Sequence, residues 1–324
     1  MTALVERPLE AADLAACTTI FYTATDELFA RWNQPPLPRH DRDGLMAFFA
    51  ELAFGPAGRA WVAARRDGSP AAFGIAIERE ATWFLSFLFV DPGVQASGVG
   101  RGLLLRLLPT PGSPAAAPGA LRHTCVDSLQ PISAGLYATS GILPRMPIFE
   151  LLGRPRSGAL PALPEGILAV PFQARAPGRR AGADRPAGGK ALPSDLLAEL
   201  DAVDRRVLGW RRRVDHRAWL DEGRLLVRYR ARGGAPLGYG YVHASGRSGP
   251  IAVRDAALLP AVLGDLLGRL QPPDAWRVYV PGPSTSLGPL IEAGLRINGN
   301  PAIWSSSADG PAWGGYLPAS FALL

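Results

Sequence analysis

The sequence predicts an α/β protein with two similar domains in tandem, each a central mixed β-sheet flanked by helices. Three observations lead to this fold class. The chain has 324 residues, which exceeds the usual size of a single domain. The stretch Trp83–Leu108 combines an apolar strand pattern, a turn and a Leu-rich helix pattern. The second half of the chain then repeats the order of strands and helices of the first half.

Apolar periodicity predicts the elements of the first half in order. One helix should run from Glu10 towards Trp32 and another over residues 41–54, because apolar residues recur there at helical spacing. A turn signal at Arg66–Ser69 separates the two strands of a hairpin. The expected strands are Val5–Leu9, Ala60–Arg65, Ala72–Glu78, Trp83–Val90, Leu121–Asp127 and Phe149–Leu152. Because a helix over Arg101–Leu108 separates the fourth strand from the fifth, these two strands should be parallel.

A Gly- and Pro-rich stretch predicts the domain boundary. We expect a linker at residues 156–164, so that one domain spans residues 1–155 and the other residues 165–324. Residues Gln173–Lys190 are rich in Arg, Gly, Ala and Pro, which predicts a loop. The second half has strand patterns at Gly166–Phe172, Leu225–Arg230, Leu237–His243, Gly249–Val253 and Trp276–Val280, and helix patterns at Ser194–Leu208, Ala257–Leu270 and Ser284–Ala293.

Composition limits the compartment and the ligands. Cys17 and Cys125 are the chain's two cysteines, so we expect neither a disulfide framework nor a Cys-rich metal site, and a reducing compartment fits. The stretch after Met1 carries acidic residues, and no later apolar run is long enough to span a membrane. We therefore expect a cytoplasmic protein without a membrane partner or a bound metal.

The basic charge of the chain raises the question of nucleic acid as a partner. The formal net charge is +6, and arginines cluster over residues 205–217. Aspartates and glutamates are interleaved with these arginines, which favours a solvated helical surface over a stripe that follows phosphates. A nucleic-acid binder therefore stays a subordinate hypothesis.

The glycines at Gly98 and Gly100 allow three phosphate-binding designs, and spacing separates them. A Walker loop needs Gly-Lys-Ser/Thr, but Arg101 follows Gly100 and the chain's one lysine is Lys190. A dinucleotide fingerprint from Gly98 needs glycine at position 103, where Leu103 stands. What remains is an uncapped helix start without side chains in the way, which attracts phosphate. The alternative is a strand-to-helix turn with glycines for close packing alone.

The spacing around these glycines follows the pattern Val-x-Pro-x-x-Gln-x-x-Gly-x-Gly, from Val90 to Gly100. Together with the strand before it and the apolar helix after it, this pattern resembles the acyl-CoA signature of the GNAT superfamily of N-acyltransferases. The resemblance implies that acetyl-CoA, or another short acyl-CoA, binds here as co-substrate. The implied cofactor-binding residues are Leu88, Phe89, Val90, Gln95, Ala96, Ser97, Gly98, Val99, Gly100 and Arg101.

A second stretch, residues 128–142, resembles the loop, helix and Leu-Tyr pair of the same superfamily. It departs from the superfamily pattern at Ser133, where asparagine is common, and at Ile142, where phenylalanine is usual. In that family the helix lies against the cofactor and its tyrosine points to the thioester sulfur. The resemblance thus adds Ser133 and Tyr137 to the cofactor-binding residues and makes Tyr137 the candidate general acid for the departing thiolate. The alternative is a tyrosine that only packs.

Acyl transfer to an amine also calls for a base, although positioning supplies much of the acceleration. Four side chains lie on or beside the strands that would frame the cleft: Glu78, Glu80, His123 and Asp127. Each also has a structural or solvated interpretation, and we take Glu78 as the candidate base. In the resembling family the segment between the first two helices covers the acceptor site, which makes Asp26, Glu27 and Trp32 candidate acceptor contacts. Cys125 lies in an apolar strand, where a thiol is expected to be inert.

The second half looks like a copy that has lost the phosphate loop. Gly74 and Gly238 precede the strand ends Val90 and Val253 by almost the same number of residues, which supports a duplication. Residues 253–260 have neither the glutamine nor the paired glycines of the first copy. We therefore expect no CoA in the second domain, which would instead support the acceptor cleft or stabilise the pair, and a separate ligand site there stays open.

Together, these patterns predict a tandem GNAT-like acyltransferase. Its N-terminal domain would transfer an acetyl or other short acyl group from CoA to an amine of a small molecule or peptide. A catalytically silent acyl-CoA sensor or interaction protein is the alternative. The sequence leaves a homodimer open.

Overall fold

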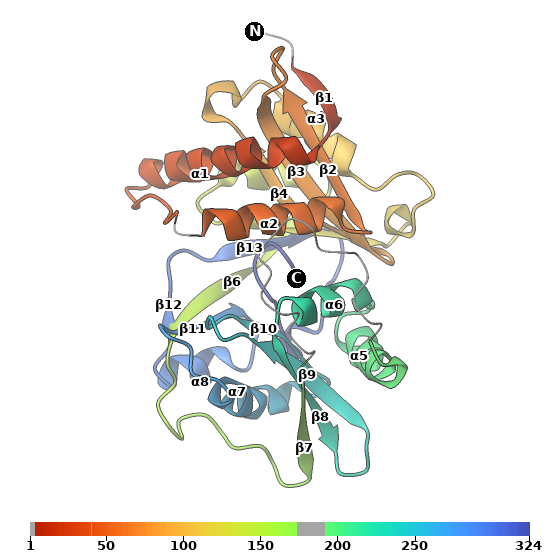
Figure 1. Ribbon diagram of the computed structural model, residues 1–324, viewed down its shortest axis with the longest axis vertical. Helices are drawn as coiled ribbons and strands as arrows, with labels where there is room; N and C mark the ends of the chain where they lie inside the picture. Colours follow the sequence, from red (N-terminus) through yellow and green to blue (C-terminus); the bar gives the residue numbers. More distant parts are fainter. Residues whose placement is uncertain (1–3, 40, 174–191) are drawn as a thin grey trace. The chain divides into compact units, whose positions relative to one another are not determined.

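The computed structural model describes residues 4–39, 41–173 and 192–324 (Figure 1). The chain divides into two compact units. The first unit comprises the chain up to Arg145 together with Ala302–Asp309, and the second comprises Met146–Pro301 together with Gly310–Leu324. Most of the predicted loop Gln173–Lys190 lies outside the described residues. Among the described helices, none combines the length and apolar character needed to cross a membrane.

The first unit contains a mixed sheet with the strand order β1-β2-β3-β4-β5-β13. Its strands are β1 (Val5–Pro8), β2 (Gly58–Ala64), β3 (Pro70–Arg79), β4 (Thr82–Val90), β5 (Leu121–Asp127) and β13 (Ala302–Ser306). Neighbours pair antiparallel except β4 and β5, which are parallel. The mixed sheet and the parallel pair predicted from the sequence are thus confirmed.

Helices cover both faces of this sheet. The α-helices among the described residues of this unit are α1 (Leu14–Arg31), α2 (Arg42–Phe54), α3 (Val99–Leu107) and α4 (Pro131–Ala138). On one face, α1 and α2 pack against the sheet through an aromatic cluster of Phe21, Phe49, Phe73, Phe87 and Phe89. On the other face, residues of α3 and α4 join β4 in a hydrophobic cluster that contains Trp83, Leu85, Leu104, Leu107, Val126 and Tyr137.

The second unit contains two groups of strands. In the first group, β6 (Leu143–Gly153) pairs antiparallel with β11 (Trp276–Pro281) and with β12 (Arg296–Ile297). The second group has the order β14-β10-β9-β8-β7. Its strands are β7 (Ile167–Phe172), β8 (Leu225–Ala231), β9 (Pro236–Val242), β10 (Ser248–Val253) and β14 (Tyr316–Leu317), and the helices of the unit are α5 (Ser194–Val207), α6 (Arg213–Asp221), α7 (Leu259–Gly268) and α8 (Leu287–Glu292).

Each unit takes in a segment from the other half of the chain. The predicted strand Phe149–Leu152 exists within β6, but its ladders with β11 and β12 belong to the second unit. Strand β13, which no sequence pattern indicated, completes the first sheet beside β5. The compact units therefore differ from the predicted domains 1–155 and 165–324, because a strand pattern does not identify the partner of the strand.

The predicted duplication is confirmed in strand order, but the glycines that suggested it are not equivalent. At the end of β4, the Asp91 amide donates to the Ala71 carbonyl at 2.9 Å, and at the end of β10 the Arg254 amide donates to the Leu237 carbonyl at 2.8 Å. The residue opposite Val90 is accordingly Ala72, and the residue opposite Val253 is Gly238. Gly238 therefore corresponds to Ala72 and not to Gly74.

Candidate active site

Strand β4 separates from β5 halfway along its length. Residues Thr82–Leu85 pair with Leu121–Thr124, and the hydroxyl of Thr124 donates to the Leu85 carbonyl at 2.8 Å. The ladder does not continue beyond Leu85, although β4 runs on to Val90. At this point Ser86 is the extra residue of a β-bulge against β3, and among the described residues its buried hydroxyl has no hydrogen-bond partner.

The separated half of β4 presents backbone groups on the side of β5. Hydrogen bonds alternate along an antiparallel strand, and the Asp91 amide is directed to β3. The amides of Leu88 and Val90 therefore point away from β3, in the direction from which an extended ligand chain could accept hydrogen bonds. The backbone of Phe89 faces β3 instead, and its ring lies 4.8 Å from the ring of Phe21.

After β4, the chain turns through a short 3-10 helix, Pro92–Val94, into α3. Gly98 has φ of +84° and precedes α3, and no side chain caps this helix start. A Cβ added to Gly98 would have no heavy atom within 4 Å, whereas a Cβ added to Gly100 would lie 3.5 Å from a methyl carbon of Val90. The first amides of a helix have no partner within it, and with the helix dipole they attract phosphate.

Side chains of the loop hold its backbone in place. The Gln95 side-chain amide donates to the Val90 carbonyl at 3.2 Å, and the Ser97 hydroxyl donates to the Val94 carbonyl at 2.6 Å. Ala96 adopts φ of +60°, which is uncommon for a residue with a Cβ. Arg101, in the first turn of α3, is exposed. The structure therefore brings the predicted loop residues together around one uncapped helix start.

Tyr137 lies on the α3 and α4 face of the sheet. It is 5 % exposed and belongs to the hydrophobic cluster that includes Leu85 and Val126. Burial raises the pKa of its phenol, and a hydrogen bond with Ser133, one helical turn earlier, opposes that rise. The phenol therefore keeps its proton across the physiological pH range, as a proton donor must.

Glu78 and Glu80 lie away from the separated half of β4. Glu78 pairs with Trp83 near the start of β4, whereas Gly74 pairs with Leu88. Four residues of extended strand separate Glu78 from Gly74, a distance of about 13 Å. Glu78 also accepts a hydrogen bond from Ser113 at 2.6 Å. Glu80 lies in the turn that follows β3, at the same end of the sheet.

His123 is buried within the first sheet. It is 2 % exposed, and burial lowers its pKa to about 3. Its Nδ1 atom accepts a hydrogen bond from the indole of Trp304 at 3.2 Å, and its ring lies 4.8 Å from that of Phe84. A neutral, enclosed imidazole of this kind has a structural role, which agrees with the structural interpretation of His123 given above.

Asp127 is the candidate base that lies at the separation. It is the last residue of β5 and lies beyond Thr124, the last residue of β5 that pairs with β4. Because successive side chains alternate between faces, Asp127 lies on the face opposite to Val126, the face that α1 and α2 cover. Burial raises the pKa of its carboxyl group, although a hydrogen bond from the Leu129 amide at 2.8 Å opposes the rise.

The loop after Asp127 also holds Trp32. The indole of Trp32 donates to the Leu129 carbonyl at 3.0 Å, and the side chain remains 51 % exposed. The backbone of Leu129 thus contacts both residues: its amide donates to the Asp127 carboxylate, and its carbonyl accepts from Trp32 at the end of α1. The sequence indicated both residues but not their proximity, because residues 32 and 127 are brought together by the tertiary structure.

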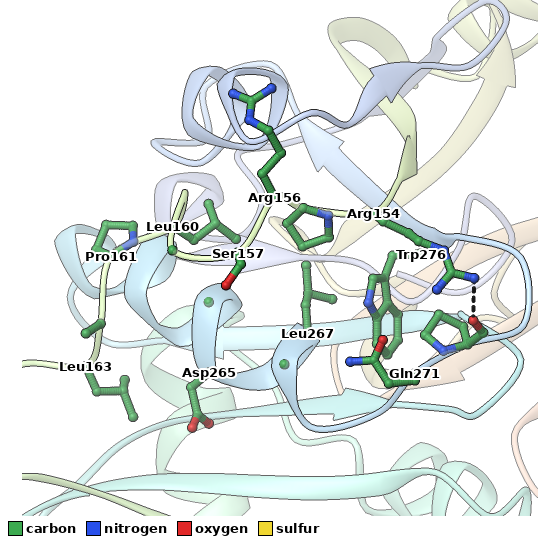
Figure 2. A pocket seen from close by; sticks show the side chains of 16 residues that line it. Arg154, Arg156, Ser157, Leu160, Pro161, Leu163, Asp265, Leu267, Gln271 and Trp276 are labelled. Carbon is green, nitrogen blue, oxygen red and sulfur yellow. Dashed lines mark hydrogen bonds between the residues drawn. The ribbon is translucent and has the colours of Figure 1, made fainter.

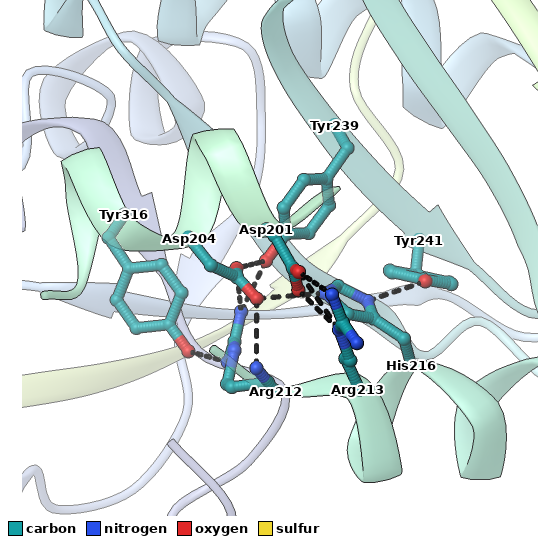
Figure 3. Close-up of polar contacts among 8 residues, drawn as sticks. All are labelled: Asp201, Asp204, Arg212, Arg213, His216, Tyr239, Tyr241 and Tyr316. Atoms are coloured by element: carbon teal, nitrogen blue, oxygen red, sulfur yellow. Dashed lines mark hydrogen bonds and ion pairs between the residues drawn. The ribbon is translucent and has the colours of Figure 1, made fainter. Parts of the chain in front are cut away.

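In the second unit, part of the Arg-rich segment is buried and not solvated. Asp204, Arg212 and His216 are at most 1 % exposed and form one network with tyrosines from two strands, β9 and β14 (Figure 3). Aspartates interleaved with arginines indicate ion pairing, but the pattern does not distinguish pairs at the surface from pairs in the interior. The prediction of a solvated helical surface was wrong for these residues, whereas Arg205, Arg206 and Arg213 are exposed.

The predicted linker lines a cavity of about 650 Å³ in the second unit (Figure 2). Leu160 and Leu163 pack against the core beside α7, and the guanidinium of Arg154 donates to the Pro272 carbonyl at 2.8 Å. The carboxylate of Asp265 already accepts a hydrogen bond from Tyr229 at 2.8 Å. Arg154 and Asp265 are thus engaged within the protein. No group of three or more metal-ligating side chains is found among the described residues.

Comparison with known proteins identifies the first unit. Residues 18–141 match the sequence pattern of the acetyltransferase (GNAT) family. This part of the chain is a GNAT domain. No curated protein matches the sequence.

Solved structures share the fold over nearly the whole chain. A putative acetyltransferase from Pyrococcus horikoshii has a TM-score of 0.68 at 15 % identity, with 100 % of this chain and 97 % of that chain covered. A GCN5-related N-acetyltransferase from Sphaerobacter thermophilus has a TM-score of 0.55 at 17 % identity, covering 95 % and 97 %. A tandem GNAT protein from the clavulanic acid biosynthesis pathway has a TM-score of 0.54 at 15 % identity, covering 95 % and 99 %. The fold is thus that of tandem GNAT proteins.

Proposed function

We propose that the first unit is an N-acetyltransferase that transfers an acetyl or other short acyl group from CoA to an amine of a small molecule or peptide. The observation that carries the proposal is the separation of β4 from β5 after Leu85, directly before an uncapped helix start. An extended acyl arm needs unpaired backbone groups, and a diphosphate needs free amides. The GNAT domain provides both within one continuous stretch, residues 86–101.

Different residues of that stretch would bind different parts of the ligand. The amides of Leu88 and Val90 would hold the acyl arm, because they are directed away from β3. Backbone groups from Gln95 to Arg101 would hold the diphosphate at the start of α3. The open space beside Gly98 fits this assignment, because no heavy atom of the protein lies within 4 Å of the position where a side chain would begin.

For the chemistry, we assign Asp127 as the base in place of Glu78. A thioester supplies an activated acyl group, and the amine must lose a proton when its nitrogen bonds to the acyl carbon. Asp127 would take this proton, directly or through water, from the face covered by α1 and α2. On the opposite face, the hydroxyl of Tyr137 would donate a proton to the departing sulfur, and Ser133 would orient that hydroxyl.

Binding of acetyl-CoA can be tested by placing a charge at the helix start. In Gly100→Asp, the new carboxylate suits the dipole of α3 but repels a diphosphate. We expect at least a tenfold loss of acetyl-CoA affinity by isothermal titration calorimetry, with no loss of thermal stability. Leu105→Asp is the matched control, because Leu105 is an exposed residue of the same helix. Equal affinity in both variants would argue against this phosphate site.

A second candidate function is a catalytically silent acyl-CoA sensor, which the enclosed position of Tyr137 favours. Release of CoA thiol in the presence of a panel of amines separates the two candidates. An enzyme should show turnover that falls by about a hundredfold or more in Tyr137→Phe. Tight binding of acetyl-CoA without turnover for any amine would support the sensor.

A further inference from the structure

In the second unit, β10 and β11 start side by side and then separate. An isolated parallel bridge joins Arg247 to Arg277, and the hydroxyl of Ser248 donates to the Arg277 carbonyl at 2.8 Å. Beyond this point β10 pairs with β14, which also lies against β11. In the first unit, the corresponding strands are β4 and β5, whose ladder ends at Leu85. Strand β14 therefore occupies the place that we propose for the acyl arm in the first unit.

The backbone groups of β10 that β14 covers correspond to the groups of β4 that we propose for binding the acyl arm. The matching hydrogen bonds of Asp91 and Arg254 make Val253 the equivalent of Val90, and hence Ile251 the equivalent of Leu88. Ile251 pairs with Leu317. The next residues, Ala252 and Tyr316, pair in the same ladder, and a Cβ on Gly315 would come within 2.4 Å of the Val253 carbonyl oxygen.

The position equivalent to the phosphate loop is also filled from within the protein. The carboxylate of Asp255 accepts a hydrogen bond from the Ala257 amide at 3.0 Å, and the hydroxyl of Thr285 donates to the Ala256 carbonyl at 2.9 Å. A Cβ on Gly314 would lie 3.3 Å from that of Ala256. Asp91 caps the corresponding turn of the first unit in the same way. The difference is that α7 follows the turn in the second unit directly, without the glycine-containing loop that precedes α3.

A buried polar network holds β14 in place (Figure 3). The guanidinium of Arg212 donates to the hydroxyl of Tyr316 at 2.6 Å and stacks over the same ring. The Asp204 carboxylate accepts from the Tyr239 hydroxyl at 2.5 Å and lies 3.0 Å from the Nε2 atom of His216. Burial would raise the pKa of Asp204, but His216 and Arg212 outweigh it and hold that pKa below its usual value.

The rest of the segment is enclosed as well. Leu317, Ala319, Leu323 and Leu324 are each at most 5 % exposed, and the ring of Phe321 lies 4.7 Å from that of Tyr279 in β11. Removing the segment from the sheet would expose these apolar side chains and leave the Arg212 charge with fewer partners in the interior. The segment is therefore an integral occupant and not a loosely attached tail.

We propose that the gap between β10 and β11 is a strand-binding site that evolved from an acyl-CoA slot and is occupied by this chain's own segment Trp313–Leu324. The class of ligand is an extended peptide with a tyrosine opposite Arg212. A consequence, which rests on the proposed function, is that each chain binds one acyl-CoA, in the first unit.

Amide hydrogen exchange on the full chain tests this proposal, because the two units provide matched sites in one molecule. Without ligand, the amides of Ile251–Val253 and Gly315–Leu317 should be protected, and acetyl-CoA should not change their exchange. Rapid exchange of Ile251–Val253 without ligand, or new protection there on adding acetyl-CoA, would overturn the proposal. In the first unit, acetyl-CoA should newly protect the amides of Leu88 and Val90. If acetyl-CoA does not protect these amides while the second unit behaves as expected, the result contradicts the proposed function but not the strand-binding site.

A tyrosine variant tests the anchor of the segment. Tyr316→Phe keeps the ring but removes the hydroxyl that Arg212 contacts, so we expect exchange of Gly315–Leu317 to rise at least tenfold while β8 and the first unit stay unchanged. Tyr229→Phe is the matched control, because it removes the buried hydroxyl that contacts Asp265 in the same unit. Unchanged exchange of Gly315–Leu317 in Tyr316→Phe would show that the network does not hold the segment.

Discussion

Asp127 and Tyr137 lie on opposite faces of the first sheet, where β4 separates from β5. Their environments suit different tasks. The phenol of Tyr137 is enclosed and stays protonated, whereas Asp127 is half-buried and has one carboxylate oxygen fixed by the Leu129 amide. A proton donor and a proton acceptor on either side of a reacting thioester would serve acyl transfer.

For the single residue Asp127, we predict that Asp127→Asn lowers kcat/KM for amine acetylation by about a hundred- to ten-thousandfold. Affinity for acetyl-CoA should stay within about twofold, because Asp127 lies away from the phosphate loop. Burial disfavours the charged carboxyl, so the neutral amide should not lower the melting temperature near pH 7. Steady-state kinetics, titration calorimetry and thermal unfolding measure the three effects.

The dependence of activity on pH reports the titration of the Asp127 carboxyl group. Because burial raises the pKa of Asp127, the basic form becomes available at higher pH than for an exposed aspartate. Activity of the wild type should therefore rise with pH through this displaced pKa, and Asp127→Asn should lack the rise. Asp67→Asn, in an exposed turn where hydrogen bonds from Ser69 lower the pKa, is the control. A profile unchanged by Asp127→Asn would exclude Asp127 as the base.

At the scale of elements, the two glycines around the start of α3 have different tasks. Gly98 adopts a left-handed conformation with open space where a side chain would begin, so its backbone angle is what requires glycine. Gly100 lies inside the helix, where any residue can adopt the backbone, so its lack of a side chain serves the approach of a ligand. The same residue type is needed for two physical reasons.

We therefore predict opposite stability effects for two alanine variants. Gly98→Ala should destabilise the first unit by about 1 kcal/mol through backbone strain. Gly100→Ala should stabilise it by up to about 1 kcal/mol through helix propensity, because its Cβ meets only ordinary van der Waals contact with Val90. Denaturant unfolding monitored for the first unit measures both. A loss of stability in Gly100→Ala equal to that in Gly98→Ala would contradict the assignment of the two roles.

The sequence predicted this element well because strand, turn and helix start follow each other in the chain. The apolar run, the proline and the glycine spacing are all local signals, and the structure places β4, the 3-10 turn and α3 within a few residues of the predicted bounds. The choice of Glu78 as the base depended instead on which residues of β3 and β5 lie beside Leu88. Strand register decides that, and register is not local.

On the scale of the whole molecule, the units exchange strands and cannot be separated by one cut. The segment Ala302–Asp309 returns to the first unit, where the Ser307 amide donates to the Arg122 carbonyl at 2.8 Å. Trp304 lies beside Cys125 in the same ladder and donates to His123. Without β13, the edge of β5 would lose these partners and would expose unpaired backbone groups.

We predict that a fragment of residues 1–145 aggregates or unfolds without a cooperative transition. The same fragment joined to residues 300–309 through a flexible linker should recover a cooperative transition, because β13 again covers β5. Size-exclusion chromatography and circular dichroism melting, with the full chain as reference, provide the comparison. A cooperative melt of the shorter fragment near that of the full chain would disprove the structural need for β13.

The sequence by itself determined the order of strands and helices, the parallel relation of β4 and β5, and the glycine-rich helix start. These follow from backbone preferences and apolar periodicity within short stretches. Only the tertiary structure decided that β13 completes the first sheet, that Glu78 pairs near the start of β4 while Asp127 ends β5 beyond the point of separation, and that Arg212 anchors β14 in the interior of the second unit. Those outcomes depend on pairing and burial between residues far apart in the chain, where many partners are equally compatible with the local pattern.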